Sequence, residues 1–249
     1  MKMKNLLIGG MSLALVACIS VGGTLAYLTA KTDTMTNTFT VGAGYGNNVL
    51  TLDETKVIKE GDVVKENPTV IGGEGNRTSD DQTYAPINIG DQFVKDPTFH
   101  VKANSASSYV FAKVTGMDEL VAKGFIVGNK DVGGKLTAGI DKNVWERVAD
   151  ENGDPVQTGD KKYDGYYIYK GTKSTYGVIA TSTSDIDLEA LFTYIELPAT
   201  VENMPNLGEK GMSINVAGAI IQSENLDEST ALTEVLKIEG FGTAASAVD

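Results

Sequence analysis

The sequence predicts an all-β protein, built as one antiparallel β-sandwich behind an apolar N-terminal leader. Short runs of β-branched and aromatic residues recur along the chain, and glycine, aspartate and asparagine separate them. Hydrophobic residues make up 41% of the composition and charged residues 22%, which is enough apolar material for a core. Of the 249 residues, 249 − 26 = 223 remain once residues 1–26 are set aside as a leader. A single sandwich or barrel of that length is common.

The first segment has the features of a secretory signal peptide. Two lysines precede Leu6 to Val21, a mostly apolar run that contains glycines and is shorter than the roughly 20 residues of a stable membrane span. Thr24 and Ala26 supply small side chains just before Tyr27. We therefore expect cleavage between Ala26 and Tyr27, a secreted product, and contact with a membrane only through the uncleaved leader. An uncleaved N-terminal anchor is the alternative.

A β-strand is predicted directly after the cleavage site. Thr32 to Val41 is rich in β-branched residues, and the glycine-rich run Gly42 to Gly46 follows it as a hinge. Phe39 and Val41 share one face of such a strand because side chains alternate. The residues expected to act as the N-terminal strand are Thr36, Asn37, Thr38, Phe39, Thr40 and Val41. The predicted organisation is a signal peptide (1–26), an assembly strand with hinge (27–46) and one β-sandwich domain (47–249).

The remaining elements follow from alternation and turn residues. Expected strands are 49–52, 56–64, 98–102, 109–114, 144–149, 156–158, 165–169, 190–196 and 213–222. The run 109–114 is apolar on both faces, which indicates a central strand. One or two helical turns are expected at 117–123, and helical spacing is found at 227–237, where Asp227 is the expected N-cap. Residues 72–82 are expected to form a polar surface loop, and Asp150 to Asp154 a hairpin turn.

Charge and cysteine content exclude several classes of partner and chemistry. The formal net charge is −12. Loss of Lys2 and Lys4 with the leader leaves 21 − 2 = 19 basic against 33 acidic residues, or −14. Such a surface repels nucleic acid and anionic lipid, so we expect neither as a partner. The single cysteine, Cys18, lies in the leader, so the expected mature chain has no disulfide and no thiol nucleophile.

No residue pattern of a known catalytic centre is found, so we expect no enzyme activity, no cofactor and no metal site. His100 is the single histidine, and its strand directs it outward. Zinc hydrolysis uses several histidine or carboxylate ligands at fixed spacing. Asp150 to Asp154 has only a superficial likeness to a calcium loop. Tyrosines at 163, 166, 167, 169 and 176, with Trp145, form either a sugar-binding platform or core packing, and packing is the expectation.

The short sequence motifs around the cleavage site resemble those of a known group of exported proteins. They are Gly22-Gly23-Thr24, Ala26-Tyr27 and Asn37-Thr38-Phe39-Thr40-Val41-Gly42. Together they resemble leaders processed by SipW-type signal peptidases, as found in the TasA/camelysin family of Gram-positive biofilm matrix proteins and its BsaA-like branch. In the body, Gly90-Asp91, Lys95-Asp96-Pro97 and Ser105 to Val114 are also similar to that family. Residues 116–139 and 150–162 show less likeness, so no binding property of those loops is carried over.

The resemblance implies a jelly-roll-like antiparallel sandwich that is secreted and assembled into extracellular biofilm matrix fibres. It implies cleavage by a SipW-type signal peptidase and self-association by donation of the N-terminal strand to the next subunit, with matrix accessory proteins as further partners. Two other functions stay open. One is a monomeric cell-surface adhesin or ligand-binding module whose N-terminal strand folds onto its own sheet. The other is a secreted metalloprotease, an activity attributed to camelysin-type relatives, although this sequence has no motif for it.

Overall fold

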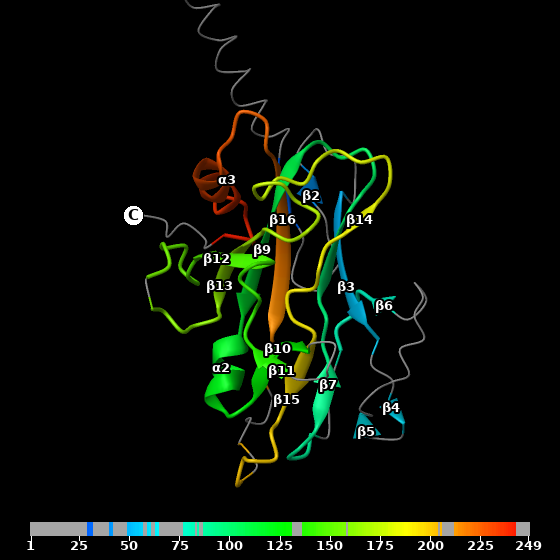
Figure 1. Ribbon diagram of the computed structural model, residues 1–249, viewed down its shortest axis with the longest axis vertical. Helices are drawn as coiled ribbons and strands as arrows, with labels where there is room; N and C mark the ends of the chain where they lie inside the picture. The colour runs from blue at the N-terminus through cyan, green and yellow to red at the C-terminus, as the bar shows by residue number, and fades with distance from the viewer. Residues whose placement is uncertain are drawn as a thin grey trace, which may run out of the picture.

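The computed structural model describes residues 29–31, 40–41, 49–56, 59–60, 63–64, 77–82, 84, 87–130, 136–157, 159–203, 205 and 212–242 (Figure 1). The strands are β1 Thr29–Lys31, β2 Thr40–Val41, β3 Leu50–Thr55, β4 Lys59–Glu60, β5 Val63–Val64, β6 Arg77–Thr78, β7 Gln92–Val94, β8 Thr98–Val101, β9 Ser108–Thr115, β10 Ile126–Lys130, β11 Leu136–Ala138, β12 Trp145–Ala149, β13 Gly165–Tyr169, β14 Ile186–Asp187, β15 Tyr194–Glu196 and β16 Asn215–Gln222. The helices are α2 Met117–Ala122 and α3 Glu228–Val235.

The fold is all-β, antiparallel and sandwich-like, as the sequence predicted. The largest sheet has six strands in the order β12-β13-β9-β16-β1-β2. Two four-stranded sheets, β14-β8-β3-β6 and β11-β10-β15-β7, accompany it, and β4 and β5 form a separate pair. Every strand pairing is antiparallel, and many join segments far apart in sequence, such as β9 with β16.

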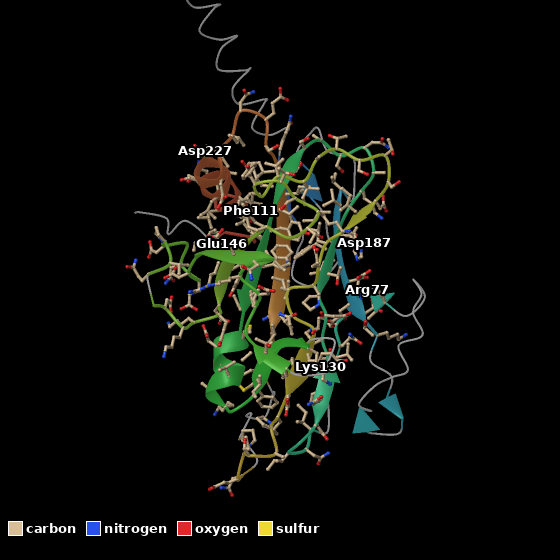
Figure 2. All side chains as sticks on the ribbon, viewed as in Figure 1. Arg77, Phe111, Lys130, Glu146, Asp187 and Asp227 are labelled. Atoms are coloured by element: carbon tan, nitrogen blue, oxygen red, sulfur yellow. The ribbon has the colours of Figure 1, made fainter. Side chains whose placement is uncertain are left out.

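The side chains of β9 pack into a separate apolar core on each face of the six-stranded sheet. Val110, Ala112 and Val114 belong to the larger apolar core, which also takes residues from the two four-stranded sheets. Tyr109 and Phe111, on the other face, belong to a second apolar core beneath α3. Figure 2 shows Phe111 on the side of the sheet that faces α3. The strand is therefore central, as its continuous apolar run indicated.

The tyrosine-rich strand β13 is part of this core. All five of its residues are buried. Trp145 lies opposite Tyr169, and their rings are 5.1 Å apart in an edge-to-face arrangement. The predicted packing of Trp145 against the alternate tyrosines is confirmed for this pair.

Both helices lie where the sequence placed them. The Asp227 side chain accepts a 2.7 Å hydrogen bond from the Thr230 backbone N–H, which confirms Asp227 as the N-cap of α3. Ala231 and Val235 are the buried residues of α3. Figure 1 shows α3 and α2 near opposite ends of the long strands β9 and β16.

Several predicted strands differ from those observed. Val156 and Gln157 are not in a strand, because β12 pairs with β13 and pairs beyond the 150–154 turn only through the isolated bridge Ala149↔Pro155 among the described residues. The strand expected over 190–196 covers only Tyr194–Glu196. Residues 72–82 were expected to be an exposed loop, but Arg77–Thr78 forms β6 and pairs with β3. In each case a partner distant in sequence decides which residues join the ladder.

Candidate functional site

The N-terminal segment lies at the edge of the six-stranded sheet. Strand β1 pairs antiparallel with β16 in the register Thr29↔Ile221, Ala30↔Ile220 and Lys31↔Ala219. Strand β2 then pairs with β1, with Ala30 opposite Val41. Backbone pairing of this kind depends on an extended chain and on register, and any segment of suitable sequence can supply it. The edge of β16 is therefore a site for a β-strand.

The structure places only some of the predicted assembly residues. Thr40 and Val41 form β2, one strand further out than β1. Thr36, Asn37, Thr38 and Phe39 lie outside the described residues, and so do Ala26, Tyr27 and the hinge Gly42 to Gly46. The strand that directly contacts β16, Thr29–Lys31, was not singled out from the sequence. Three residues containing one alanine and one lysine carry too little alternation to indicate a strand.

Strand β16 has the composition of a strand that needs a neighbour on each side. Its residues Val216 to Ile221 are all buried. Its other edge is taken over its full length by β9, from Asn215↔Thr115 to Gln222↔Ser108. Gly218 allows the Phe99 ring to approach, since a Cβ there would lie 2.2 Å from that ring. An uncovered apolar edge of this length would invite uncontrolled strand pairing, and β1 covers it at Ala219 to Ile221.

A polar cluster of Asp53, Arg77, Asp96, His100 and Asp187 lies on the sheet β14-β8-β3-β6. The Asp53 Oδ1 atom accepts from Arg77 Nε at 2.5 Å and lies 2.9 Å from His100 Nε2. The His100 Nδ1 atom lies 2.7 Å from Asp187 Oδ1. Arg77 Nη1 donates to Asp96 Oδ2 at 2.9 Å. Figure 2 shows Arg77 and Asp187 on the side of the molecule away from α3.

The surroundings of His100 favour its charged form. Burial acts to lower the pKa of His100, but hydrogen bonds and charge attraction from Asp53 and Asp187 outweigh it and raise the pKa above 6.5. Burial also acts to raise the pKa of Asp53, and the hydrogen bonds from His100 and Arg77 outweigh it and lower the pKa. The histidine is predicted outward and is indeed only partly buried, whereas Phe99 and Val101 beside it are buried.

This polar cluster connects strands through ion pairs. Each charged group is engaged by an opposite charge from another strand, and the histidine has carboxylates at both ring nitrogens. A general base would need one ring nitrogen directed at a substrate proton. Within the described parts of the chain, no group of three or more histidine, cysteine, aspartate or glutamate side chains is placed to hold a metal ion.

A buried ion pair lies next to the polar cluster. Lys95 Nζ donates to Glu54 Oε2 at 2.5 Å, and Gln82 Nε2 donates to Glu54 Oε1 at 2.8 Å. Glu54 is fully buried, and the Lys95 side chain is 9% exposed. Lys95 directly follows β7, and Glu54 belongs to β3, so the pair joins two sheets. Sequence reasoning missed it, because the two residues are far apart and neither has a recognisable pattern.

The 147–164 region forms a polar groove of about 350 Å³. Arg147 and Asp164 line it, together with residues of the 150–160 loop. The Asp150 carboxylate accepts from the backbone N–H groups of Asn152 and Asp154 at 2.8 and 3.0 Å. It is therefore used to stabilise the turn, in agreement with the hairpin interpretation of this segment.

Comparisons of the chain with protein-family models, with curated proteins and with solved structures found no match in any of the three. Among the described residues, no helix is long and apolar enough to cross a membrane.

Proposed function

We propose that the protein is a secreted structural subunit of extracellular matrix fibres and has no enzymatic activity. Assembly would follow cleavage before Tyr27 by a SipW-type signal peptidase, when the freed N-terminal strand is donated to a neighbouring copy. The observation that carries the proposal is the pairing of Thr29–Lys31 with the apolar strand β16. The resemblance of the leader and body to the TasA/camelysin family supports the same proposal.

The pairing has a geometry that permits exchange between copies. Hydrogen bonds in an antiparallel ladder join backbone groups and do not distinguish the chain's own strand from that of a neighbour. Donation from one subunit to the next is a head-to-tail contact, and such a contact grows into a filament when it does not close. The β16 residues next to β1, Ala219 to Ile221, are buried in the two apolar cores, so backbone pairing is the described part of the contact.

A monomeric surface adhesin or ligand-binding module is the second candidate. The observation in its favour is that β1 pairs with β16 of the same chain, as an N-terminal strand folded back onto its own sheet would. The two candidates differ in where the N-terminal strand is found in the mature protein. A fibre subunit exchanges it, and a monomer keeps it.

The decisive experiment compares the mature chain, residues 27–249, with a variant that lacks residues 27–41. Electron microscopy and light scattering should show fibres for the first and none for the second. A synthetic peptide of residues 27–41 should bind the shortened variant and raise its Tm, since a ligand of the folded state stabilises it. A scrambled peptide is the control.

If the shortened variant does not fold, Ala30→Pro in the mature chain is the second test, because proline removes a backbone donor from β1. Normal fibres from either variant would rule out strand donation. A monodisperse monomer of the unaltered mature chain would favour the surface module.

A further inference from the structure

The segment 174–178 ends in a tight hairpin turn with an aromatic residue at its tip. The Thr175 N–H donates to the Val178 carbonyl at 2.9 Å, and the Val178 N–H donates to the Thr175 carbonyl at 3.0 Å. Tyr176 and Gly177 are the two residues between them, with φ of 52° and 82°. Positive φ at both central residues is the requirement of a type I′ turn, for which Asn-Gly is the favoured sequence.

Tyr176 is an unusual residue for this conformation. Three described non-glycine residues have positive φ, and the other two, Asn104 and Asn225, are asparagines. Asparagine tolerates the left-handed region, while a bulky side chain is strained there. At Tyr176 the chain therefore carries a residue that makes the turn less stable than asparagine would.

The Tyr176 side chain gains nothing in return from the described parts of the chain. The Tyr176 side chain is 93% exposed, and among the described residues no other large hydrophobic side chain is exposed in this way. We expected Tyr176 to pack with the other tyrosines, and that expectation is wrong for this residue. Strain at an exposed position is a reason to look for a function outside the monomer.

The turn is held firmly at one end of the six-stranded sheet. Ile179 exchanges two backbone hydrogen bonds with Ser108, the first residue of β9, at 2.8 and 2.9 Å. Ser108 lies opposite Gln222, the residue after Ile221, with which Thr29 pairs. The Tyr176 turn therefore lies at the end of the sheet at which the chain enters β1. On the other side of the turn, Lys170 lies against Gly177 and forms an ion pair with Glu228 at the start of α3.

The charge around the turn also favours contact with another copy of the chain. Residues 171–180 contain no carboxylate and include the exposed Lys173, although the whole chain has a net charge of −12. The carboxylates that lie against this segment are engaged, since Glu189 accepts from Thr172 and Glu146 and Glu228 pair with Lys170. Two acidic molecules repel each other least where one of them presents a neutral or cationic patch. Tyrosine is also among the residues that most often anchor protein contacts.

We propose that Tyr176 is an anchor of the contact between neighbouring copies of this chain. The inference rests on the proposed fibre function and adds a side-chain contact to the exchange of backbone strands. Tyr176 would bury its ring on the next subunit, at the end of the sheet where the N-terminal strand passes between copies.

The test is Tyr176→Asn in the mature chain, with Thr175→Asn as the matched control on the same turn. Since asparagine suits the left-handed conformation, Tyr176→Asn should raise the Tm by about 2 to 4 °C. It should also raise the critical concentration for fibre formation about tenfold, as loss of an interface anchor does. The control should change neither quantity in this way. A more stable protein that assembles less well separates lost contact from lost folding.

An unchanged critical concentration in Tyr176→Asn would overturn the inference and leave strand donation intact. A lower Tm of Tyr176→Asn would mean that tyrosine does not strain the turn, and the inference depends on that strain. If the unaltered mature chain forms no fibres, the proposed function fails. Sedimentation velocity at high protein concentration then tests the role of Tyr176. Equal self-association of the unaltered chain and of Tyr176→Asn would exclude that role. Weaker self-association of Tyr176→Asn would support it.

Discussion

His100 is held at both ring nitrogens by carboxylates from two strands, Asp53 on β3 and Asp187 on β14. A charged imidazolium donates to both, whereas a neutral ring must turn one nitrogen lone pair toward a carboxylate. The pKa of His100 is raised above 6.5 in the folded protein. The stabilisation from this residue is therefore fully present below pH 6.5, and it is lost as the pH rises through the folded pKa.

We predict that the free energy of unfolding falls with rising pH above about 6.5 in the unaltered protein and falls less in His100→Gln. Urea unfolding at a series of pH values measures the difference. At the acid end the Asp53 pKa is lowered, so its contribution is present above pH 3.8 and is lost as the pH falls through the folded pKa. Parallel curves for the two proteins above pH 6.5 would contradict the assignment of this change to His100.

The carboxylate partners of His100 could not be predicted from the sequence. Its alternation directs His100 outward, and that direction is confirmed. The identity of its partners depends on the pairing of β8 with both β3 and β14, which brings together residues 47 and 87 positions apart. Arg77 likewise belongs to a segment whose polar composition predicted only an exposed loop.

At the scale of elements, the buried pair Glu54–Lys95 joins β3 to the segment after β7. Removal of one partner from such a pair leaves a buried charge without compensation. We predict that Lys95→Met lowers the free energy of unfolding by about 3 to 5 kcal/mol. Chemical denaturation followed by tryptophan fluorescence is a suitable measurement, because Trp145 lies in the core that these sheets share.

The control for this prediction is the double variant Glu54→Gln with Lys95→Met. It removes both charges and leaves an amide oxygen to accept from Gln82, so it should recover most of the lost stability. If the double variant is as unstable as Lys95→Met, the loss comes from the packing of the lysine stem and not from the uncompensated carboxylate.

The elements predicted well from sequence are those whose pattern is local and long. Strands β9, β13 and β16 have continuous apolar or aromatic runs, and α3 has an N-cap and helical spacing. The short strands β1, β6 and β14 have two or three residues each. A partner strand defines elements of this length, and single-sequence periodicity does not detect them.

At the scale of the whole molecule, composition and alternation were enough to predict an all-β sandwich. They did not predict that two four-stranded sheets accompany one six-stranded sheet, or that the N-terminal segment takes the place next to β16. These features depend on pairings between distant parts of the chain. The strand next to β16 is formed by residues 29–31, whereas the predicted assembly residues are 36–41, of which the structure describes Thr40 and Val41 in β2; donation of this segment to another copy stays a prediction.

The net charge of the mature chain, 19 − 33 = −14, acts on any assembly of this molecule. Copies that approach one another repel over distances comparable to the screening length, while strand pairing and a tyrosine contact act only at short range. Repulsion therefore opposes the first encounter more than it opposes the finished contact. Screening by salt should favour assembly, which is the opposite of what a contact between oppositely charged faces would show.

We predict that the critical concentration for fibre formation falls several-fold when sodium chloride rises from about 0.01 M to about 1 M, which shortens the screening length from about 30 Å to about 3 Å. Sedimentation of fibres at each salt concentration gives the value. Potassium chloride at equal ionic strength should have the same effect, because screening does not depend on the identity of a monovalent ion. A critical concentration that rises with salt would mean that paired charges hold the copies together. The contact between copies would then involve the exposed lysines and not the uncharged Tyr176 turn.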